Sequence, residues 1–269
     1  MGKITVIGIG PGEAQQMTFL AKECLDKADI IVGYSGYVSL LGEEFSEKEI
    51  LSTGMKKEVD RCRLCFEKAI EGNSVALICS GDAGIYGMAS LIYELAPEYM
   101  SGHGNSGDET DNSCTDRSSN SELVIEVVPG ITAASSGAAV LGAPTNHDFC
   151  TISLSDLLTP WELIEKRLQH AAEGDFVIAL YNPSSHKRAD YLQKACDILL
   201  SILPGDRACG YVKNIGREDT LSWTGNLSEL RDEQVDMFTT CFIGNSQSFI
   251  RDEKLITPRG YMSKENKGI

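Results

Sequence analysis

The chain of 269 residues is long enough for one large or two medium-sized domains, each with its own hydrophobic core. Its 42% hydrophobic and 23% charged residues are typical of a soluble globular protein. The formal net charge of -15 repels a phosphate backbone, so we expect no nucleic-acid partner. No apolar run reaches the length of a membrane span and no signal-peptide pattern precedes the first strand, so we expect a cytoplasmic protein without a membrane partner.

The alternation of strand and helix patterns in the first half of the chain predicts an α/β fold with a mostly parallel sheet. The expected strands cover 4–9, 30–32, 74–79 and 123–128, and the expected helices cover 17–28, 35–41, 56–71 and 88–96. A helix of small residues follows the last strand and begins near Thr132. The range 101–121 lacks large apolar side chains, so we expect a disordered surface insertion there.

The second half begins a new α/β unit after a linker at 142–148, so we expect domains at 1–143 and 149–269. The expected strands cover 149–154, 176–181, 208–212, 220–224 and 237–243, and a further helix covers 189–200. The helix that ends near Ala172 has a good start signal, with Thr159 as N-cap and Pro160 in the first position.

The nine cysteines are scattered, and most lie within apolar patterns that are typical of buried free thiols in a reducing compartment. Only Cys62 and Cys65 have a metal-like spacing, and no second pair or histidine stands near them. They belong to a helical stripe with Val59, Phe66 and Ile70. We therefore predict core packing there and no metal site.

The stretch Ser80–Met88 is the central candidate for a ligand site, because it follows an apolar strand and contains three glycines and Asp82. In an open α/β sheet, ligands bind beyond the carboxyl ends of the strands, and glycines let the backbone approach a ligand closely. A tight turn with an aspartate cap is the alternative for this segment taken alone.

A second glycine loop, Gly8–Gly12, follows the first strand and looks like a dinucleotide fingerprint at first. The third glycine of that fingerprint would fall at Glu13, whose carboxylate repels a pyrophosphate, and Pro11 lacks an amide donor. A nicotinamide cofactor is therefore rejected. The loop suits a ligand with an adenosyl group and no phosphates.

Five segments occur together and in order, and they resemble the tetrapyrrole methylase family of S-adenosylmethionine-dependent enzymes. The segments are 8–12, 80–82, 129–133, 181–183 and 213–216. The resemblance covers nearly the whole chain apart from the insertion, although many relatives have proline where this chain has Ala83. It implies two α/β domains with the active site in the cleft between them, and usually a homodimer. It also implies that S-adenosylmethionine contacts Pro11, Ser80, Gly81, Asp82, Ile85, Thr132, Ala133, Asn182 and Ile215 or Gly216.

Within the family, the segments 154–161 and 257–261 are similar to the branch that methylates carbon 17 of precorrin-3B and contracts the macrocycle. The sequence leaves open whether the precorrin substrate carries cobalt. Diphthine synthase and ribosomal RNA methylases share the fold, but the acidity of the chain disfavours RNA. A tetrapyrrole-binding module without catalytic activity is the alternative from another class.

Ring contraction must move protons, so acids and bases near the predicted linker are candidates for this role. His147, Asp148 and Asp156 are the catalytic candidates, and Ser153 and Ser155 are possible donors to the substrate. A loop or capping role for Asp156 and a polar hinge at 147–148 are the alternatives. Basic residues that could bind the carboxylates of the substrate are Lys187, Arg188, Lys213, Arg217 and Arg259. A solvated helix entry is the alternative for the basic run that contains Lys187 and Arg188.

Overall fold

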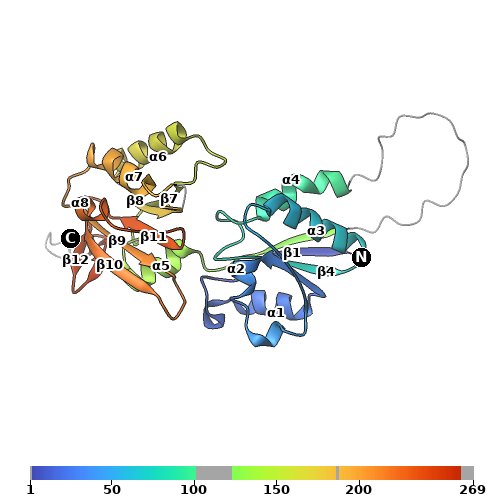
Figure 1. Cartoon of the computed structure of the whole chain (residues 1–269). Helices are drawn as coiled ribbons and strands as arrows, with labels where there is room; N and C mark the ends of the chain where they lie inside the picture. Colours follow the sequence, from blue (N-terminus) through green and yellow to red (C-terminus); the bar gives the residue numbers. More distant parts are fainter. Residues whose placement is uncertain (1, 101–122, 186–187, 262–269) are drawn as a thin grey trace, which may run out of the picture. The chain divides into compact units, whose positions relative to one another are not determined.

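The computed structural model describes residues 2–100, 123–185 and 188–261 (Figure 1). The insertion expected at 101–121 and the candidate Lys187 lie outside the described residues. Two compact units, Met1–Thr132 and Ala133–Ile269, make up the chain, and each is described by itself. Among the described helices, none combines the length and the apolar character needed to cross a membrane.

The first unit is built around a parallel sheet of strand order β3-β2-β4-β1-β5. Its strands are β1 (Lys3–Gly8), β2 (Ile30–Tyr34), β3 (Glu49–Thr53), β4 (Ser74–Cys79) and β5 (Val124–Val128). Its helices are α1 (Phe19–Lys27), α2 (Ser35–Val38), α3 (Glu58–Ile70) and α4 (Ala89–Met100), with short 3-10 turns η1 (Ala14–Gln16) and η2 (Glu43–Phe45). Because all five strands are parallel, their carboxyl ends lie at one edge of the sheet.

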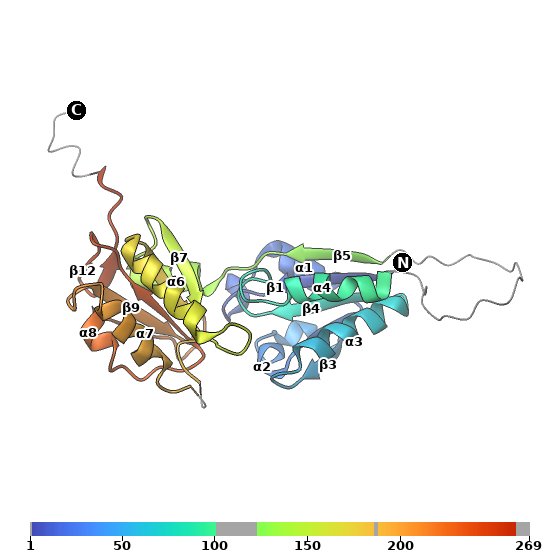
Figure 2. The same cartoon turned by 90° about the horizontal axis from the view of Figure 1, so that it is seen from above.

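Helices cover both faces of this sheet, as Figures 1 and 2 show for α3 and α4 on one face and α1 on the other. Side chains alternate between the faces along each strand. Ile4 and Val6 of β1 pack in the cluster that includes α3 and α4, whereas Ile7 packs in the cluster that includes α1. Burial on both faces explains why these strands are almost continuously apolar.

The second unit contains a mixed sheet of order β10-β9-β11-β8-β7, in which β7 and β8 are parallel and the other neighbours are antiparallel. Its strands are β7 (Phe149–Ser153), β8 (Val177–Tyr181), β9 (Ala208–Lys213), β10 (Leu221–Asn226) and β11 (Thr239–Ile243). Helices α6 (Trp161–Glu173), α7 (Tyr191–Leu200) and α8 (Leu227–Leu230) pack on one face, and α5 (Ala133–Leu141) packs on the other. The carboxyl ends of β7, β8 and β9 share one edge of the sheet, which we call the carboxyl edge.

The boundary between the units lies before α5, and not after it as predicted. Ala134, Ala138 and Leu141 of α5 are buried against Phe242 of β11, so this helix belongs to the core of the second unit. The segment predicted as a linker also has structure. It begins with β6 (Gly142–Ala143), which forms a small sheet with β12 (Phe249–Arg251) and β13 (Lys254–Ile256).

Other local predictions need correction. The edge strand β3 was not predicted, and α2 ends at Val38, well before the expected helix end. On α3, Val59 and Ile70 are exposed, while Cys62 and Cys65 are fully buried as predicted. Helix α6 begins at Trp161 with an extended Pro160 before it, which leaves Thr159 outside the helix.

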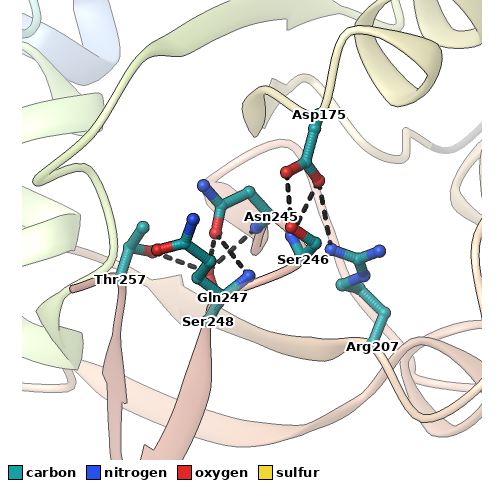
Figure 3. A network of polar contacts seen from close by, with 7 residues as sticks. All are labelled: Asp175, Arg207, Asn245, Ser246, Gln247, Ser248 and Thr257. Atoms are coloured by element: carbon teal, nitrogen blue, oxygen red, sulfur yellow. Dashed lines mark hydrogen bonds and ion pairs between the residues drawn. The ribbon is translucent and has the colours of Figure 1, made fainter. Parts of the chain in front are cut away.

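Polar contacts join four chain segments at the edge of the second sheet opposite to the carboxyl edge (Figure 3). Asp175, just before β8, accepts hydrogen bonds from the amide and hydroxyl of Ser246 at 2.7 and 2.6 Å, and Arg207 lies 3.4 Å from the same carboxylate. The hydroxyl oxygens of Ser248 and the fully buried Thr257 are 2.7 Å apart. These contacts fix the C-terminal segment to the sheet.

Candidate active site

In the first unit, the loops after β1 and β4 are joined by their backbones beyond the carboxyl ends of the strands. Gly10 donates to Gly81 at 3.1 Å, and Gly81 donates to Gly10 at 2.7 Å. Both glycines have positive φ angles, of 79° and 68°, which other residues rarely adopt. Pro11, Ser80 and Gly81, three of the predicted cofactor residues, are therefore brought together.

The glycines of these loops approach one another, and this is the main reason that glycine is needed there. A Cβ at Gly130 would lie 2.1 Å from the carbonyl oxygen of Gly81 and 2.6 Å from that of Gly8. A Cβ at Gly8 would lie 2.7 Å from the amide nitrogen of Gly130. The sequence interpretation assigned the glycines to close approach by a ligand, but the structure shows close approach by backbone.

Asp82 holds the loop after β4 in shape and ties it to the loop after β5. Its Oδ1 accepts hydrogen bonds from the amides of Gly84 and Ile85 at 2.8 and 3.1 Å, and its Oδ2 accepts one from Gly130 at 2.9 Å. Both carboxylate oxygens are thus engaged by the protein. Asp82 lies among the predicted cofactor residues, and these contacts give it a positioning role.

A buried arginine that the sequence analysis missed braces the same loop from its other end. Arg61 of α3 is 2% exposed, and it donates to Thr53 Oγ1 at 2.8 Å, to the carbonyl of Gly54 at 3.0 Å and to Met88 Sδ at 3.3 Å. The ring of Tyr34 lies 5.9 Å from its guanidinium carbon. These partners stand at the ends of β2, β3 and the loop after β4. The position of Arg61 next to the apolar stripe of α3 is the feature of the sequence that could have indicated a buried arginine.

The three loops fit an adenosyl cofactor without phosphates. The segments 8–12, 80–88 and 129–132 contain no Lys, Arg or His, and several of their amides are used by the Gly10–Gly81 pairing and by Asp82. Ile85, Tyr86 and Ile131 are exposed and offer apolar surface. Gln16 Oε1, just after the first loop, is buried without a donor among the described residues, so it could accept a hydrogen bond from a ligand.

At the carboxyl edge of the second unit, the loops after β7 and β8 form a network around Asp156. Arg188 Nη1 donates to Asp156 Oδ1 at 3.0 Å and to Ser155 Oγ at 2.8 Å. Tyr191, at the start of α7, donates to Asp156 Oδ2 at 2.5 Å. The hydrogen bond from Tyr191, with a further contribution from Arg188, lowers the pKa of Asp156, and the same bond raises the pKa of Tyr191.

Two more predicted residues join this network through their side chains. Asn182 Nδ2 donates to Ser153 Oγ at 2.9 Å, and the same oxygen accepts a hydrogen bond from the amide of Ser155 at 3.3 Å. Asn182 has a φ of 54°, and Asn214 after β9 has a φ of 51°. Asparagine adopts left-handed backbone more readily than most residues, so both loops can turn sharply at these positions.

The predicted cofactor residues Ala133, Ile215 and Gly216 also lie near the carboxyl edge, but they differ in which of their atoms a ligand could reach. Helix α5 begins at Ala133, and Tyr181 at the end of β8 accepts a hydrogen bond from the amide of Ala134 at 2.7 Å. Ile215 is 6% exposed and packs in the core below α5, so only its backbone can reach a cofactor. Gly216 has a φ of 68°.

The three basic candidates at the carboxyl edge differ in whether they form an ion pair with a carboxylate of the protein. Arg188 is paired with Asp156, and Lys213 Nζ lies 2.6 Å from Asp236 Oδ2. Arg217 stacks on the ring of Phe238 with 5.0 Å between its guanidinium carbon and the ring centroid, and it has no ion pair with a described carboxylate. All three nevertheless lie at the carboxyl edge of the second sheet.

Three predicted site residues lie at the opposite edge. The carbonyl of Asp148 accepts a hydrogen bond from Val177 where β7 and β8 begin, so His147 and Asp148 are separated from Asp156 by the length of β7, roughly 17 Å. The amide of Thr257 donates to the carbonyl of Ala143 in β6, and Arg259 lies within about 7 Å of Thr257 along the chain. The three catalytic candidates therefore do not form one cluster.

The buried cysteines are packing residues. Burial raises the pKa of the Cys62 thiol to about 12 and that of Cys65 well above its usual range. No group of three or more metal-ligating side chains occurs in the part of the chain that the structure describes. The core role predicted for Cys62 and Cys65 is confirmed.

Known proteins resemble this chain over most of its length. The model of the family "Tetrapyrrole (Corrin/Porphyrin) Methylases" matches residues 3–103 and 109–231. A probable cobalt-factor III C(17)-methyltransferase of Salmonella typhimurium is 43% identical over 258 residues, which are 96% of this chain and 99% of that protein. A cobalt-factor III methyltransferase of Priestia megaterium is also 43% identical, over 98% of this chain, but the chain spans only 46% of that longer protein.

Two further matches lie at lower identity. A precorrin-3B C(17)-methyltransferase of a Sinorhizobium species is 36% identical, with 97% of both chains covered. The crystal structure of the methyltransferase CobJ superposes with a TM-score of 0.82 at 33% identity and covers 96% of this chain and 100% of that chain. The match extends over both units, and the predicted two-domain α/β fold is confirmed.

Proposed function

Because the chain belongs to the tetrapyrrole methylase family, we propose that it transfers a methyl group from S-adenosylmethionine to carbon 17 of cobalt-factor III in cobalamin biosynthesis. The observation that carries this assignment is the nearly full-length match to the Salmonella relative. The relative named for metal-free precorrin-3B is less similar, which favours the cobalt-containing substrate. In the branch of the family that the segments 154–161 and 257–261 resemble, contraction of the macrocycle accompanies methylation.

The loops of the first unit orient the cofactor. S-adenosylmethionine supplies a methyl group that its sulfonium sulfur has already activated, so alignment matters more than acid-base catalysis for the transfer. Correct positioning can lower a barrier by roughly 7 to 11 kcal/mol. The Gly10–Gly81 pairing, the Asp82 contacts and the Arg61 brace each fix these loops before any ligand binds.

Asp156, held by Tyr191, is the group that we assign to ring contraction. The lowered pKa keeps Asp156 an anion at neutral pH, so it can stabilise positive charge that develops on the macrocycle. The raised pKa keeps Tyr191 protonated, so its hydroxyl maintains the hydrogen bond to Asp156. Arg188 holds Asp156 in one orientation. A catalytic role for His147 and Asp148 stays a prediction. Their position at the start of β7, far from Asp156, supports this role less than the position of Asp156 supports its own.

The test of the proposed function is anaerobic incubation of the purified protein with labelled S-adenosylmethionine and, in parallel, cobalt-factor III and precorrin-3B. Mass spectrometry should show gain of one methyl group on cobalt-factor III, with the absorbance change of a contracted ring. Faster reaction of precorrin-3B would reassign the substrate. Cofactor binding without methylation of either compound would refute the assignment to this branch.

Three further properties stay predictions. The family resemblance implies a homodimer, which size-exclusion chromatography with light scattering would test. It also implies a cofactor site between the two domains, which a crystal structure with S-adenosylhomocysteine would test. A cytoplasmic location agrees with the described helices, none of which could span a membrane, and fractionation of cells would test it.

A further inference from the structure

We infer that Arg217 is the residue at the carboxyl edge of the second unit that binds a carboxylate side chain of the tetrapyrrole, whereas the charges of Arg188 and Lys213 serve the protein itself. The class of ligand rests on the proposed function. The choice among the three basic residues rests on their ion pairs, their hydrogen bonds and the surface around them.

Two of the three cations are already neutralised. Arg188 Nη1 lies 3.0 Å from Asp156 Oδ1, and Lys213 Nζ lies 2.6 Å from Asp236 Oδ2. Although burial opposes the change, the hydrogen bond from Lys213 and those from Phe238 and Thr239 lower the pKa of Asp236. A substrate carboxylate would have to compete with these internal carboxylates for either cation.

Arg217 has no such partner. No carboxylate of the described chain pairs with it, and its neighbour Asp219 instead accepts a hydrogen bond from Asn214 Nδ2 at 2.6 Å. Its Nε is buried without a hydrogen-bond partner among the described residues. Stacking on Phe238 occupies one face of the guanidinium. The N–H groups in the plane of the guanidinium stay available, and their fork matches the two oxygens of a carboxylate.

The segments on both sides of Arg217 are held in place before a ligand arrives. The amide of Phe238 donates to Asp236 Oδ1 at 2.9 Å, and its carbonyl accepts from the amide of Asn214 at 3.1 Å. The amide of Arg217 donates to the carbonyl of Asn214 at 3.1 Å, and Thr220 Oγ1 donates to the carbonyl of Arg217 at 2.6 Å. A fixed receptor loses little conformational entropy on binding.

The surface around Arg217 is apolar, as an edge of a macrocycle requires. Leu221, Met237 and Phe238 are 50%, 37% and 40% exposed, and all three lie where β10 and β11 begin, beside the end of β9. Leu158, in the loop after β7 at the same edge, is 94% exposed. In a chain of net charge -15, a cation without a carboxylate partner next to exposed apolar side chains suits an apolar ligand with several carboxylates.

The test compares Arg217→Gln with Arg217→Lys and with the matched control Arg251→Gln. Arg251 also stacks on a phenylalanine, at 5.1 Å from the ring of Phe249, but it lies on β12. Binding is measured by fluorescence titration with uroporphyrin, a stable porphyrin with carboxylate side chains, and by the KM for cobalt-factor III. Calorimetry with S-adenosylmethionine checks that each variant is folded.

We expect Arg217→Gln to weaken uroporphyrin binding and to raise the KM by about ten- to a hundredfold, as for loss of a charge-assisted hydrogen bond. Arg217→Lys should recover part of the loss because it keeps the charge but not the fork, and Arg251→Gln should bind as the wild type does. Unchanged uroporphyrin affinity and KM in Arg217→Gln would overturn the inference. If Arg217→Gln no longer binds S-adenosylmethionine, Arg217→Lys decides, and wild-type affinity in that variant overturns the inference.

The same experiment separates this inference from the proposed function. A wild-type protein that binds uroporphyrin through Arg217 but methylates neither cobalt-factor III nor precorrin-3B would refute the proposed function and support the carboxylate receptor. If the wild-type protein methylates cobalt-factor III and Arg217→Gln does not change the KM, the proposed function is supported and the carboxylate-binding role of Arg217 is refuted.

Discussion

The phenol oxygen of Tyr191 lies 2.5 Å from Asp156 Oδ2 and donates a hydrogen bond to it. The rings of Tyr191 and Trp161 pack with their centroids 4.6 Å apart, which fixes the tyrosine beside the loop after β7. The pair thus joins the start of α7 to the segment that carries the predicted catalytic aspartate. Substituting single residues of this pair, or of the loops in the first unit, should change reaction rates, stability or cofactor affinity.

Tyr191→Phe should slow ring contraction by up to about a hundredfold, the effect of losing a hydrogen bond to a charged group. The bond lowers the pKa of Asp156, so its loss should move the acidic limb of the pH–rate profile to higher pH, because the carboxylate then takes up its proton earlier as the pH falls. Tyr93→Phe on α4, an exposed tyrosine of the first unit, is the control. An unchanged pH profile in Tyr191→Phe would argue against the role of the pair.

Asp148→Asn and Asp156→Asn should act independently of each other. The two residues lie at opposite ends of β7, and effects of changes more than about 7 to 10 Å apart usually add within roughly 0.5 kcal/mol. The measurement is a double-mutant cycle on the rate of ring contraction. A double variant no slower than the slower single variant would show that the two carboxylates act as one unit.

Gly130→Ala should destabilise the first unit and weaken cofactor binding, because the new Cβ would lie 2.1 Å from the carbonyl oxygen of Gly81. Overpacking of this kind costs about 1 to 3 kcal/mol of unfolding free energy. Gly42→Ala is the control, because its Cβ would meet only the end of the flexible Glu44 side chain. Urea unfolding and calorimetry with S-adenosylmethionine measure both effects, and equal behaviour of the two variants would contradict the prediction.

Asp82→Ala should weaken cofactor binding more than Asp82→Asn does. Alanine leaves the amides of Gly84, Ile85 and Gly130 without their acceptor, whereas asparagine retains one acceptor oxygen. The amide of Gly130 is partly buried, and leaving a buried donor unsatisfied costs about 1 to 3 kcal/mol, whereas the exposed amides of Gly84 and Ile85 can bind water. The dissociation constants for S-adenosylmethionine should therefore rise in the order wild type, asparagine, alanine. Equal constants for the two variants would show that only the charge of Asp82 matters.

The buried thiols should resist alkylation in the native protein. Burial raises the pKa of Cys62 to about 12 and that of Cys79 to about 11, so the reactive thiolate is absent at pH 7 and at pH 9. Iodoacetamide labelling mapped by mass spectrometry should find the partly buried Cys24 modified and both buried thiols unmodified until urea is added. Fast native labelling of Cys62 at pH 9 would contradict its placement.

The same pKa shifts set a pH dependence of stability. An unfolded cysteine has a pKa of about 8.5, which is below the pKa of each folded thiol, so the unfolded state loses its protons first as the pH rises. The contribution of these thiols to stability should be complete below about pH 8 and should fall above it. Urea unfolding of the wild type and of Cys62→Ala across pH 7 to 10 measures this slope.

Local sequence patterns were enough to predict the α/β class, most strands and helices, the glycine loops and the family. Each of these features depends on residues that are close along the chain. The apolar run of β4 and the glycine-rich loop at Ser80–Met88 can be recognised in the sequence wherever the strand lies in the sheet. The exclusion of a dinucleotide likewise needed only Pro11 and Glu13, which stand next to the first glycines.

Which of these segments meet depends on the folded arrangement of the strands. Strand order brings Gly130 against Gly8 and Gly81, and it places α5 in the second unit, although local patterns say nothing of either. The direction of β7 separates Asp148 from Asp156, although eight positions in sequence suggested one cluster. Tyr191 and Arg61 escaped notice because their partners lie far along the chain, and a hydrogen bond is set by distance in space and not by distance in sequence.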